Sequence, residues 1–276
     1  MASQPARLHL LASQVLARVR LAVQLAQREV AARYRDSALG LVWSLLTPLF
    51  MLAVFTFVFG TVFKSRWPTA DDGGDHSTAE FAVILFTGMT VFQLFADVIT
   101  RAPRLVLENV NYVKKIVFPL AILPMVAVGS TLFDTAIRLA VLIVFIVAIQ
   151  GGLPATALLL PLVLVPYLVL ILGLSWFLSA LGVYIRDIAQ IIAPLLTAMM
   201  FLSPIFFPAS ALPAWTRPIQ VLNPIVLPVE EARNVLIWGH PPDWTALALY
   251  SVTAGIVAAL GLLWFQKTRK GFADVL

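Results

Sequence analysis

The residues best suited to polar chemistry are two pairs of opposite charge in apolar surroundings. Asp134 and Arg138 are four residues apart in a stretch that predicts a helix, so their side chains should share one face and pair. Charged groups in such an apolar stretch face the interior of the helix bundle or a water-filled cavity. The pair is therefore either structural or part of a transport path. Glu230 and Arg233 are three residues apart and are expected to pair on a second helix.

Catalytic and metal-binding patterns are scarce. The sequence has no cysteine, and its three histidines are far apart along the chain. It has no P-loop pattern for ATP and no apparent Ser–His–Asp arrangement. A membrane-embedded glycosyl or acyl transferase, kept as an alternative, would need a convergent set of His, Asp or Glu. We expect no catalytic residue, no metal ion and no cofactor in this chain.

The composition indicates a membrane protein. Of the 276 residues, 61% are hydrophobic and 12% are charged, and the net charge is +5. Soluble domains are nearer to about 45–50% apolar, so lipid must solvate much of this surface. We predict an all-α integral membrane protein.

The apolar runs predict six transmembrane helices in a single domain that covers residues 41–276. Each run is long enough to cross a hydrocarbon core of about 30 Å. The spans are expected at about 41–63, 79–100, 118–149, 156–182, 189–207 and 245–266.

Residues 1–40 are expected to form a cytoplasmic amphipathic helix before the first span. Within 7–36, apolar residues recur at spacings of three and four, and no proline interrupts them. Such a helix lies in the membrane interface, with its arginines near lipid phosphates. The alternative is a helix packed on a partner. The polar residues expected at this interface are Arg28, Arg33, Tyr34 and Arg35.

Residues 208–244 are too apolar for a solvated loop, and seven prolines divide them into short pieces. Pieces of this length cannot cross a bilayer, but they can dip in and return if other helices cover their backbone. We predict two short re-entrant helices, near 213–221 and 225–238, between spans five and six.

The distribution of positive charge predicts the orientation. Fourteen of the nineteen Lys and Arg residues lie in segments expected inside, and four lie in segments expected outside. Cytoplasmic loops collect Lys and Arg, which also explains the net charge without a nucleic-acid partner. We expect both termini to be cytoplasmic.

Several dispersed motifs closely resemble the polysaccharide and polyol-phosphate export permeases of the ABC-2 class. Together they cover nearly the whole chain from about residue 25, and their order and spacing make the resemblance specific. The matching residues are Arg33, Tyr34, Ser37, Leu39, Gly40, Trp43, Pro48, Asn109, Asn111, Lys115, Phe118, Pro119, Arg186, Asp187, Ser203, Pro204, Asn223, Pro224, Glu230, Arg233, Phe272, Ala273 and Asp274.

The resemblance implies the membrane subunit of an exporter in a bacterial inner membrane. Two copies would form the pore, and two copies of a separate ABC ATPase, which holds ATP and Mg²⁺, would drive it. The substrate would be a lipid-linked polysaccharide such as O-antigen; an ABC-2 exporter of a drug or lipid is the alternative. The residues expected to contact the ATPase are Asn109, Asn111, Lys114, Lys115, Arg186 and Asp187.

Phenylalanines at helical spacing are candidates for a sugar conduit. Aromatic rings can contact the C–H faces of sugars through many weak contacts, so a polymer could slide along them. The alternative is that these side chains face lipid or neighbouring helices. The expected conduit residues are Phe55, Phe59 and Phe63 on the first span, and Phe201, Phe206 and Phe207 near the end of the fifth.

Overall fold

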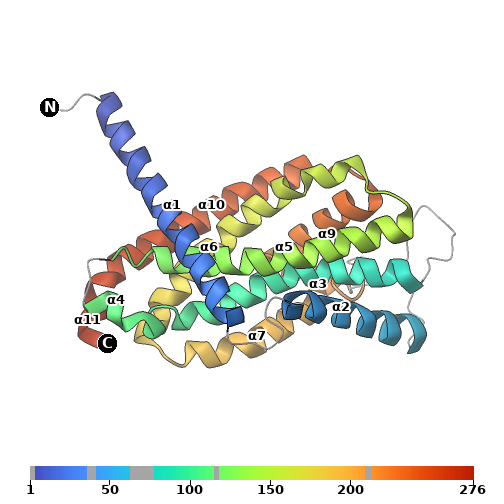
Figure 1. The fold of residues 1–276 in the computed structure, drawn as a ribbon, viewed down its shortest axis with the longest axis horizontal. Helices are drawn as coiled ribbons and strands as arrows, with labels where there is room; N and C mark the ends of the chain where they lie inside the picture. Colours follow the sequence, from blue (N-terminus) through green and yellow to red (C-terminus); the bar gives the residue numbers. More distant parts are fainter. Residues whose placement is uncertain (1–3, 36–41, 63–77, 115–117, 209–212) are drawn as a thin grey trace.

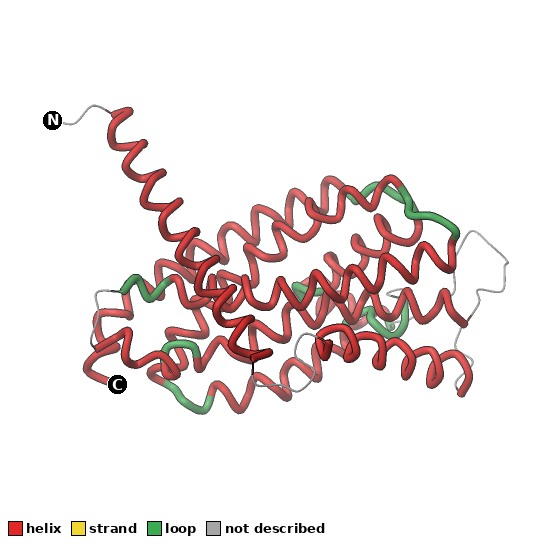
Figure 2. The backbone as a smooth tube through the Cα atoms, viewed as in Figure 1, coloured by secondary structure: helices red, strands yellow, loops and turns green. Residues whose placement is uncertain are grey.

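The computed structural model describes residues 4–35, 42–62, 78–114, 118–208 and 213–276, and every regular element in these ranges is helical. Long helices run side by side as an elongated bundle, and the first helix leaves it obliquely (Figures 1 and 2). Five segments are long and apolar enough to cross a membrane. The prediction of an all-α membrane protein is therefore confirmed.

These five segments overlap the predicted spans one, two, three, four and six. The third begins at Ile122 rather than at residue 118, after a turn at residues 120–121. The segments are α2 (Val42–Phe55) continued by the π-helix η1 (Thr56–Val62), α3 (Thr78–Arg101), α5 (Ile122–Gln150), η4 (Ala155–Leu159) with α6 (Leu160–Tyr184), and α10 (Trp244–Thr268).

The helix at the predicted fifth span is shorter than expected. Helix α7 (Ile188–Leu202) has 15 residues, or about 22 Å of rise, against a hydrocarbon core of about 30 Å. The predicted end at residue 207 is wrong: Pro204 disfavours a helical conformation at the preceding residue, and Ser203 is extended. The count of six spans thus stays a prediction.

Helix α3 is the centre of the bundle. In its most apolar window 83% of the residues are buried, against 11–39% in the other four spans. Helices α5, α6, α7 and α9 pack against it. Helices α6 and α10 pack closely on each other, because Gly173 and Gly261 let their two backbones touch.

The C-terminal half of α1 (Gln4–Arg35) packs on the start of α5. Ala22 and Ala26 are buried against Ile122 and Val126. Helix α1 is therefore docked on its own chain along this half, while its N-terminal half extends away from the bundle (Figure 1).

Short helices occupy the proline-rich segment at the predicted positions. They are η6 (Ala214–Thr216), α8 (Arg217–Leu222), α9 (Val226–Arg233) and the π-helix η7 (Asn234–Trp238). Helix α9 packs against α3, and Val229 and Ala232 are fully buried. Neighbouring helices thus cover part of its backbone.

Candidate functional site

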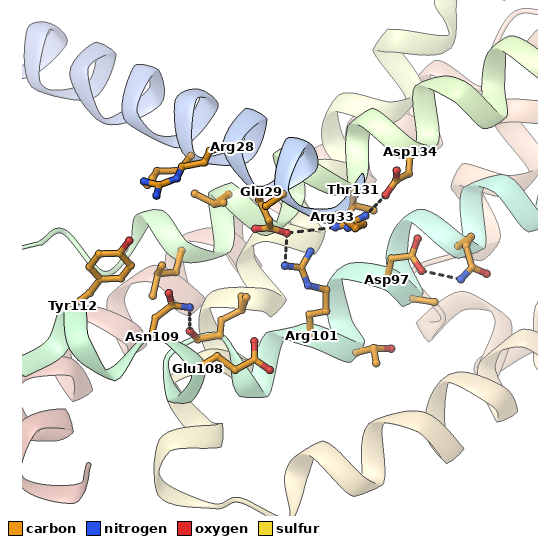
Figure 3. A pocket seen from close by; sticks show the side chains of 18 of the residues that line it. Arg28, Glu29, Arg33, Asp97, Arg101, Glu108, Asn109, Tyr112, Thr131 and Asp134 are labelled. Carbon is orange, nitrogen blue, oxygen red and sulfur yellow. Dashed lines mark hydrogen bonds and ion pairs between the residues drawn. The ribbon is translucent and has the colours of Figure 1, made fainter. Parts of the chain in front are cut away.

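A charged cavity of about 1040 Å³ lies between α1, α3, α5 and the connector that follows α3 (Figure 3). Gln93, Thr100, Asn109 and Thr131 add uncharged polar groups to its wall. Four arginines and four carboxylates line it, so their formal charges balance: Arg28, Arg33, Arg101, Arg138, Glu29, Asp97, Glu108 and Asp134.

Glu29 is the hub of an ion-pair network in this cavity. Its Oε1 accepts hydrogen bonds from Arg101 NH2 at 2.5 Å, from Ser130 Oγ at 3.0 Å and from Arg33 NH2 at 3.3 Å. Arg101 also donates to Ser130 Oγ at 3.1 Å. One carboxylate of α1 therefore links this helix to both α3 and α5. Figure 3 shows its bonds to Arg101 and Arg33.

The predicted pair between Asp134 and Arg138 is wrong. Asp134 accepts from Arg33 of α1 at 2.5 Å, whereas Arg138 NH2 donates to Asp97 of α3 at 2.8 Å. Asp97 also accepts from Gln93 at 2.8 Å. The spacing of four residues does put the two groups on one side of α5, but α1 and α3 supply better-placed counterions.

Several residues of this cavity escaped the sequence reasoning. A usable signal existed for Asp97, because a carboxylate inside an apolar span is a candidate functional residue. Glu29, Arg101 and Glu108 lie near the ends of apolar segments, where charges are ordinary, so their convergence needs the tertiary structure. Arg28 and Arg33, expected to lie near lipid phosphates, line the cavity.

The segment after α3 forms one end of the bundle together with the C-terminus. It consists of η2 (Ala102–Arg104), η3 (Leu107–Asn109) and α4 (Val110–Lys114), and α4 contacts α11 (Phe272–Val275). Helix α6 contacts η2 where Gly182 lies against the backbone of Pro103. The turn between α6 and α7 therefore meets the connector at this end (Figure 1).

This end carries the residues predicted to contact an ATPase. Asn111, Arg186 and Asp187 are exposed. Asn109 is partly buried: it lines the charged cavity and donates from Nδ2 to the carbonyl of Leu105 at 2.8 Å. Of the predicted ATPase contacts, Lys115 and the side chain of Lys114 lie outside the described part of the chain. Of the predicted interface residues on α1, Arg35 is exposed, and the side chain of Tyr34 lies outside the described part.

The two predicted sets of phenylalanines meet in space. Phe59 stacks on Phe206 with ring centroids 5.7 Å apart, and Phe206 stacks on Phe201 at 5.6 Å. Phe55 follows Phe59 at 6.3 Å. Phe207 is half-buried, while Phe63 is outside the described residues. The end of the first span and the turn after α7 thus share an aromatic row.

Arg233 is buried where α3, α9 and the turn after α7 meet. Its guanidinium donates to the carbonyls of Pro204 at 2.5 Å, Ile205 at 2.9 Å and Ile84 at 3.2 Å. The two side chains of the predicted pair with Glu230 interact electrostatically, but no salt bridge joins them within the described chain. Burial raises the pKa of Glu230, and the positive charge of the nearby Arg233 partly offsets this increase.

These features define the class: a helical integral membrane protein with a charged cavity at one end of its bundle. Residues 20–237 match the ABC-2 type transporter family, and the chain belongs to that family.

Curated relatives of the chain align over most of its length. The chain is 24% identical over 258 residues to the O-antigen export system permease protein RfbA of Klebsiella pneumoniae, covering 93% of this chain and 95% of the relative. It is 26% identical over 257 residues to RfbA of Myxococcus xanthus, covering 92% and 94%. It is 25% identical over 250 residues to the polysialic acid transport protein KpsM of Escherichia coli, covering 88% and 91%.

Proposed function

We propose that the chain is the permease subunit of an ATP-driven exporter that moves a lipid-linked polysaccharide of the O-antigen type across a bacterial inner membrane. The observation that carries the proposal is the match of the ABC-2 family over residues 20–237, together with relatives named for O-antigen and polysialic acid transport. Two copies form the pore, and two copies of a separate ABC ATPase bind ATP and Mg²⁺.

The chemistry of the charged cavity supports such a substrate. A lipid-linked glycan carries anionic phosphate and many hydroxyl groups, so its binding needs both cations and hydrogen-bonding groups. Arg28 and Arg101 offer cations, and Gln93 and Asn109 offer amides that donate and accept. Carboxylates in the same wall keep the site from holding a phosphate too tightly for release.

The position of the connector supports coupling to an ATPase. The coupling residues are Asn109, Asn111, Lys114, Lys115, Arg186 and Asp187. Arg101 is the last residue of α3 and directly precedes the connector, and its ion pair with Glu29 reaches α1. A movement of the connector would therefore displace α1 at the wall of the cavity.

The proposed topology has both termini in the cytoplasm and six spans, with α7 as the short fifth. Helices α8 and α9 are re-entrant at the outer face. The cover that α3 gives to α9 supports this arrangement, because backbone at membrane depth must be buried in protein.

Deletion of the gene, with complementation by the wild-type chain, tests the proposal. We expect loss of surface glycan together with accumulation of lipid-linked polymer inside the cell. Normal surface glycan would favour an exporter of a drug or another lipid. Loss of surface glycan without accumulated lipid-linked polymer would favour a transferase and contradict the proposal.

A further inference from the structure

A second cavity lies between α1 and the first half of α5. It is an open groove of about 1160 Å³, and Arg28 and Ala32 line both this groove and the charged cavity. Helix α1 is therefore a wall that the two cavities share. The rest of the groove is mostly apolar and includes Val30 and Ala31 of α1 and Gly129, Leu132 and Phe133 of α5.

Two arginines of α1 give this groove a positive edge. Arg28 and Arg35 are nearly two turns apart, so they lie on one side of the helix, about 10 Å apart along its axis. Both are exposed, and neither forms an ion pair with another described residue. No carboxylate is among the described residues that line the groove, whereas four carboxylates line the charged cavity. The groove therefore favours an anion.

The apolar part of the groove continues along the surface of α5. Phe133 is 38% exposed and Val144 is 64% exposed. Between them Ala136 and Ala140 are also exposed, at helical spacing, so the four residues form one stripe. The stripe rises about 16 Å, which is close to half of a hydrocarbon core of about 30 Å. One side of α5 is thus apolar and exposed over about the depth of one leaflet, and it begins at the groove.

We propose that the groove holds one anionic phospholipid of the surrounding membrane. Its phosphate lies between Arg28 and Arg35, and one acyl chain follows Phe133 and the stripe on α5. Arginines bind phosphate through charge-assisted hydrogen bonds, which are stronger than bonds between neutral groups. A zwitterionic headgroup would bring a second cation to the same two arginines, so the groove favours a headgroup with a net negative charge.

The contrast with the charged cavity separates this lipid from a transported substrate. A transported molecule must be released, and the carboxylates of the charged cavity weaken the hold of its arginines on a phosphate. The groove has no carboxylate among its described residues, so it suits a lipid that stays. Such a lipid touches both α1 and α5. It would therefore strengthen the docking of α1, which Ala22 and Ala26 already provide by apolar contact with α5.

Three substitutions on α1 separate the groove from its surroundings. Arg35→Gln removes a cation that lines the groove but not the charged cavity. Arg20→Gln is the matched control, because it removes the same charge from an exposed position of the same helix that lines neither cavity. Ala31→Trp keeps both arginines but fills the space between them, since Ala31 lies about one turn from each.

Native mass spectrometry of the full permease in a neutral detergent tests the proposal. The protein is incubated with an equimolar mixture of phosphatidylglycerol and phosphatidylcholine that have the same acyl chains, and the lipid that stays bound is identified. We expect the wild type and Arg20→Gln to retain phosphatidylglycerol preferentially. One arginine near an anionic headgroup changes affinity about fivefold, so Arg35→Gln should lower this preference about fivefold. Ala31→Trp should abolish it.

Each other outcome overturns the proposal. Equal retention of the two phospholipids by the wild type would show a groove for any acyl chain, and an equal loss in Arg20→Gln would show attraction by the whole charged helix. Displacement by inorganic phosphate, or an unchanged preference in Ala31→Trp, would remove the acyl chain from the groove. Displacement by an equal amount of a polyprenyl phosphate would assign the groove to a transported lipid. If Ala31→Trp does not insert, the comparison of Arg35→Gln with Arg20→Gln decides alone.

Discussion

Arg101 of α3 donates from NH2 to Glu29 Oε1 of α1 over 2.5 Å, across 72 residues of sequence. The same Glu29 oxygen accepts from Arg33 and Ser130. A single carboxylate thus joins the long N-terminal helix to the end of α3 at the point where the connector begins. Removing its charge should loosen α1 more than any other single change on that helix.

Glu29→Gln should weaken the docking of α1 and lower export. Both side chains of the Glu29–Arg101 pair are about one-third exposed (30% and 33%), so we expect a stability loss of about 1 kcal/mol. Amide hydrogen exchange over 22–33 should rise. The control is Glu108→Gln, which changes the same group in the same cavity but removes no hydrogen bond among the described residues. Equal exchange in both variants would contradict the role of Glu29.

Asp97→Asn should destabilise the bundle because it leaves the charge of Arg138 without its counterion. The two side chains are only 29% and 20% exposed, so we expect a loss of about 3 kcal/mol, at the low end for a buried pair. Asp134→Asn should cost less, since Arg33 keeps Glu29 as a partner. Thermal unfolding of the purified variants checks the order, and the reverse order would support a pair within α5.

The sequence allowed the spans to be located but not the ion pairs. A long apolar run predicts a membrane-spanning helix because its length and hydrophobicity are local properties of the sequence. For this reason the spans predicted near α3 and α10 agree with the structure. Partners such as Arg138 and Asp97, 41 residues apart on different helices, depend on how helices pack. The same limit applies to Arg233, whose partners are backbone carbonyls that no side-chain pattern reports.

Replacing Asn109 and Asn111 with alanine should uncouple ATP hydrolysis from export. Asn111 is exposed at the connector, and Asn109 shapes the turn through its bond to Leu105. We expect the permease to insert and assemble with the ATPase, and ATP hydrolysis to continue, while surface glycan falls. Measuring hydrolysis and export in the same vesicles checks this, and unchanged export in the double variant would argue against coupling through these residues.

Glu230→Gln should stabilise the protein at neutral pH. Burial raises the pKa of Glu230, so its carboxyl group is bound to a proton more readily in the folded state than in the unfolded chain. Its contribution to stability is full below the unfolded pKa, about 4.3, and is lost as the pH rises through the folded value. Unfolding at pH 7.5 should thus favour the variant, and the difference should vanish near pH 4.

Glu231→Gln is the matched control for that measurement. Glu231 Oε2 accepts from the backbone N–H of Asp243 and from Asn234 Nδ2, both at 3.2 Å. The amide that replaces it cannot accept as strongly, so this neighbouring substitution should lower stability at pH 7.5. A gain in both variants would mean that lowering negative charge in α9, rather than burial of Glu230, is responsible.

Phe59→Leu should lower export if the aromatic row guides sugars. Phe59 stacks on Phe206, and leucine, although equally apolar, offers no flat face to a sugar ring. Phe57 lies two residues away in the same π-helix and is 60% exposed, so Phe57→Leu makes the same chemical change outside the row. We expect surface glycan to fall in the first variant and to stay normal in the second, with membrane abundance equal.

The row has two further positions that strengthen this comparison. Phe55 precedes Phe59, and Phe201 stacks on the far side of Phe206. If each ring supports the moving chain by a small contact, Phe55→Leu and Phe201→Leu should each lower export slightly, and combining them with Phe59→Leu should lower it further. If the triple variant exports as the wild type does, these phenylalanines only pack the helices, and the polymer takes another route through the membrane.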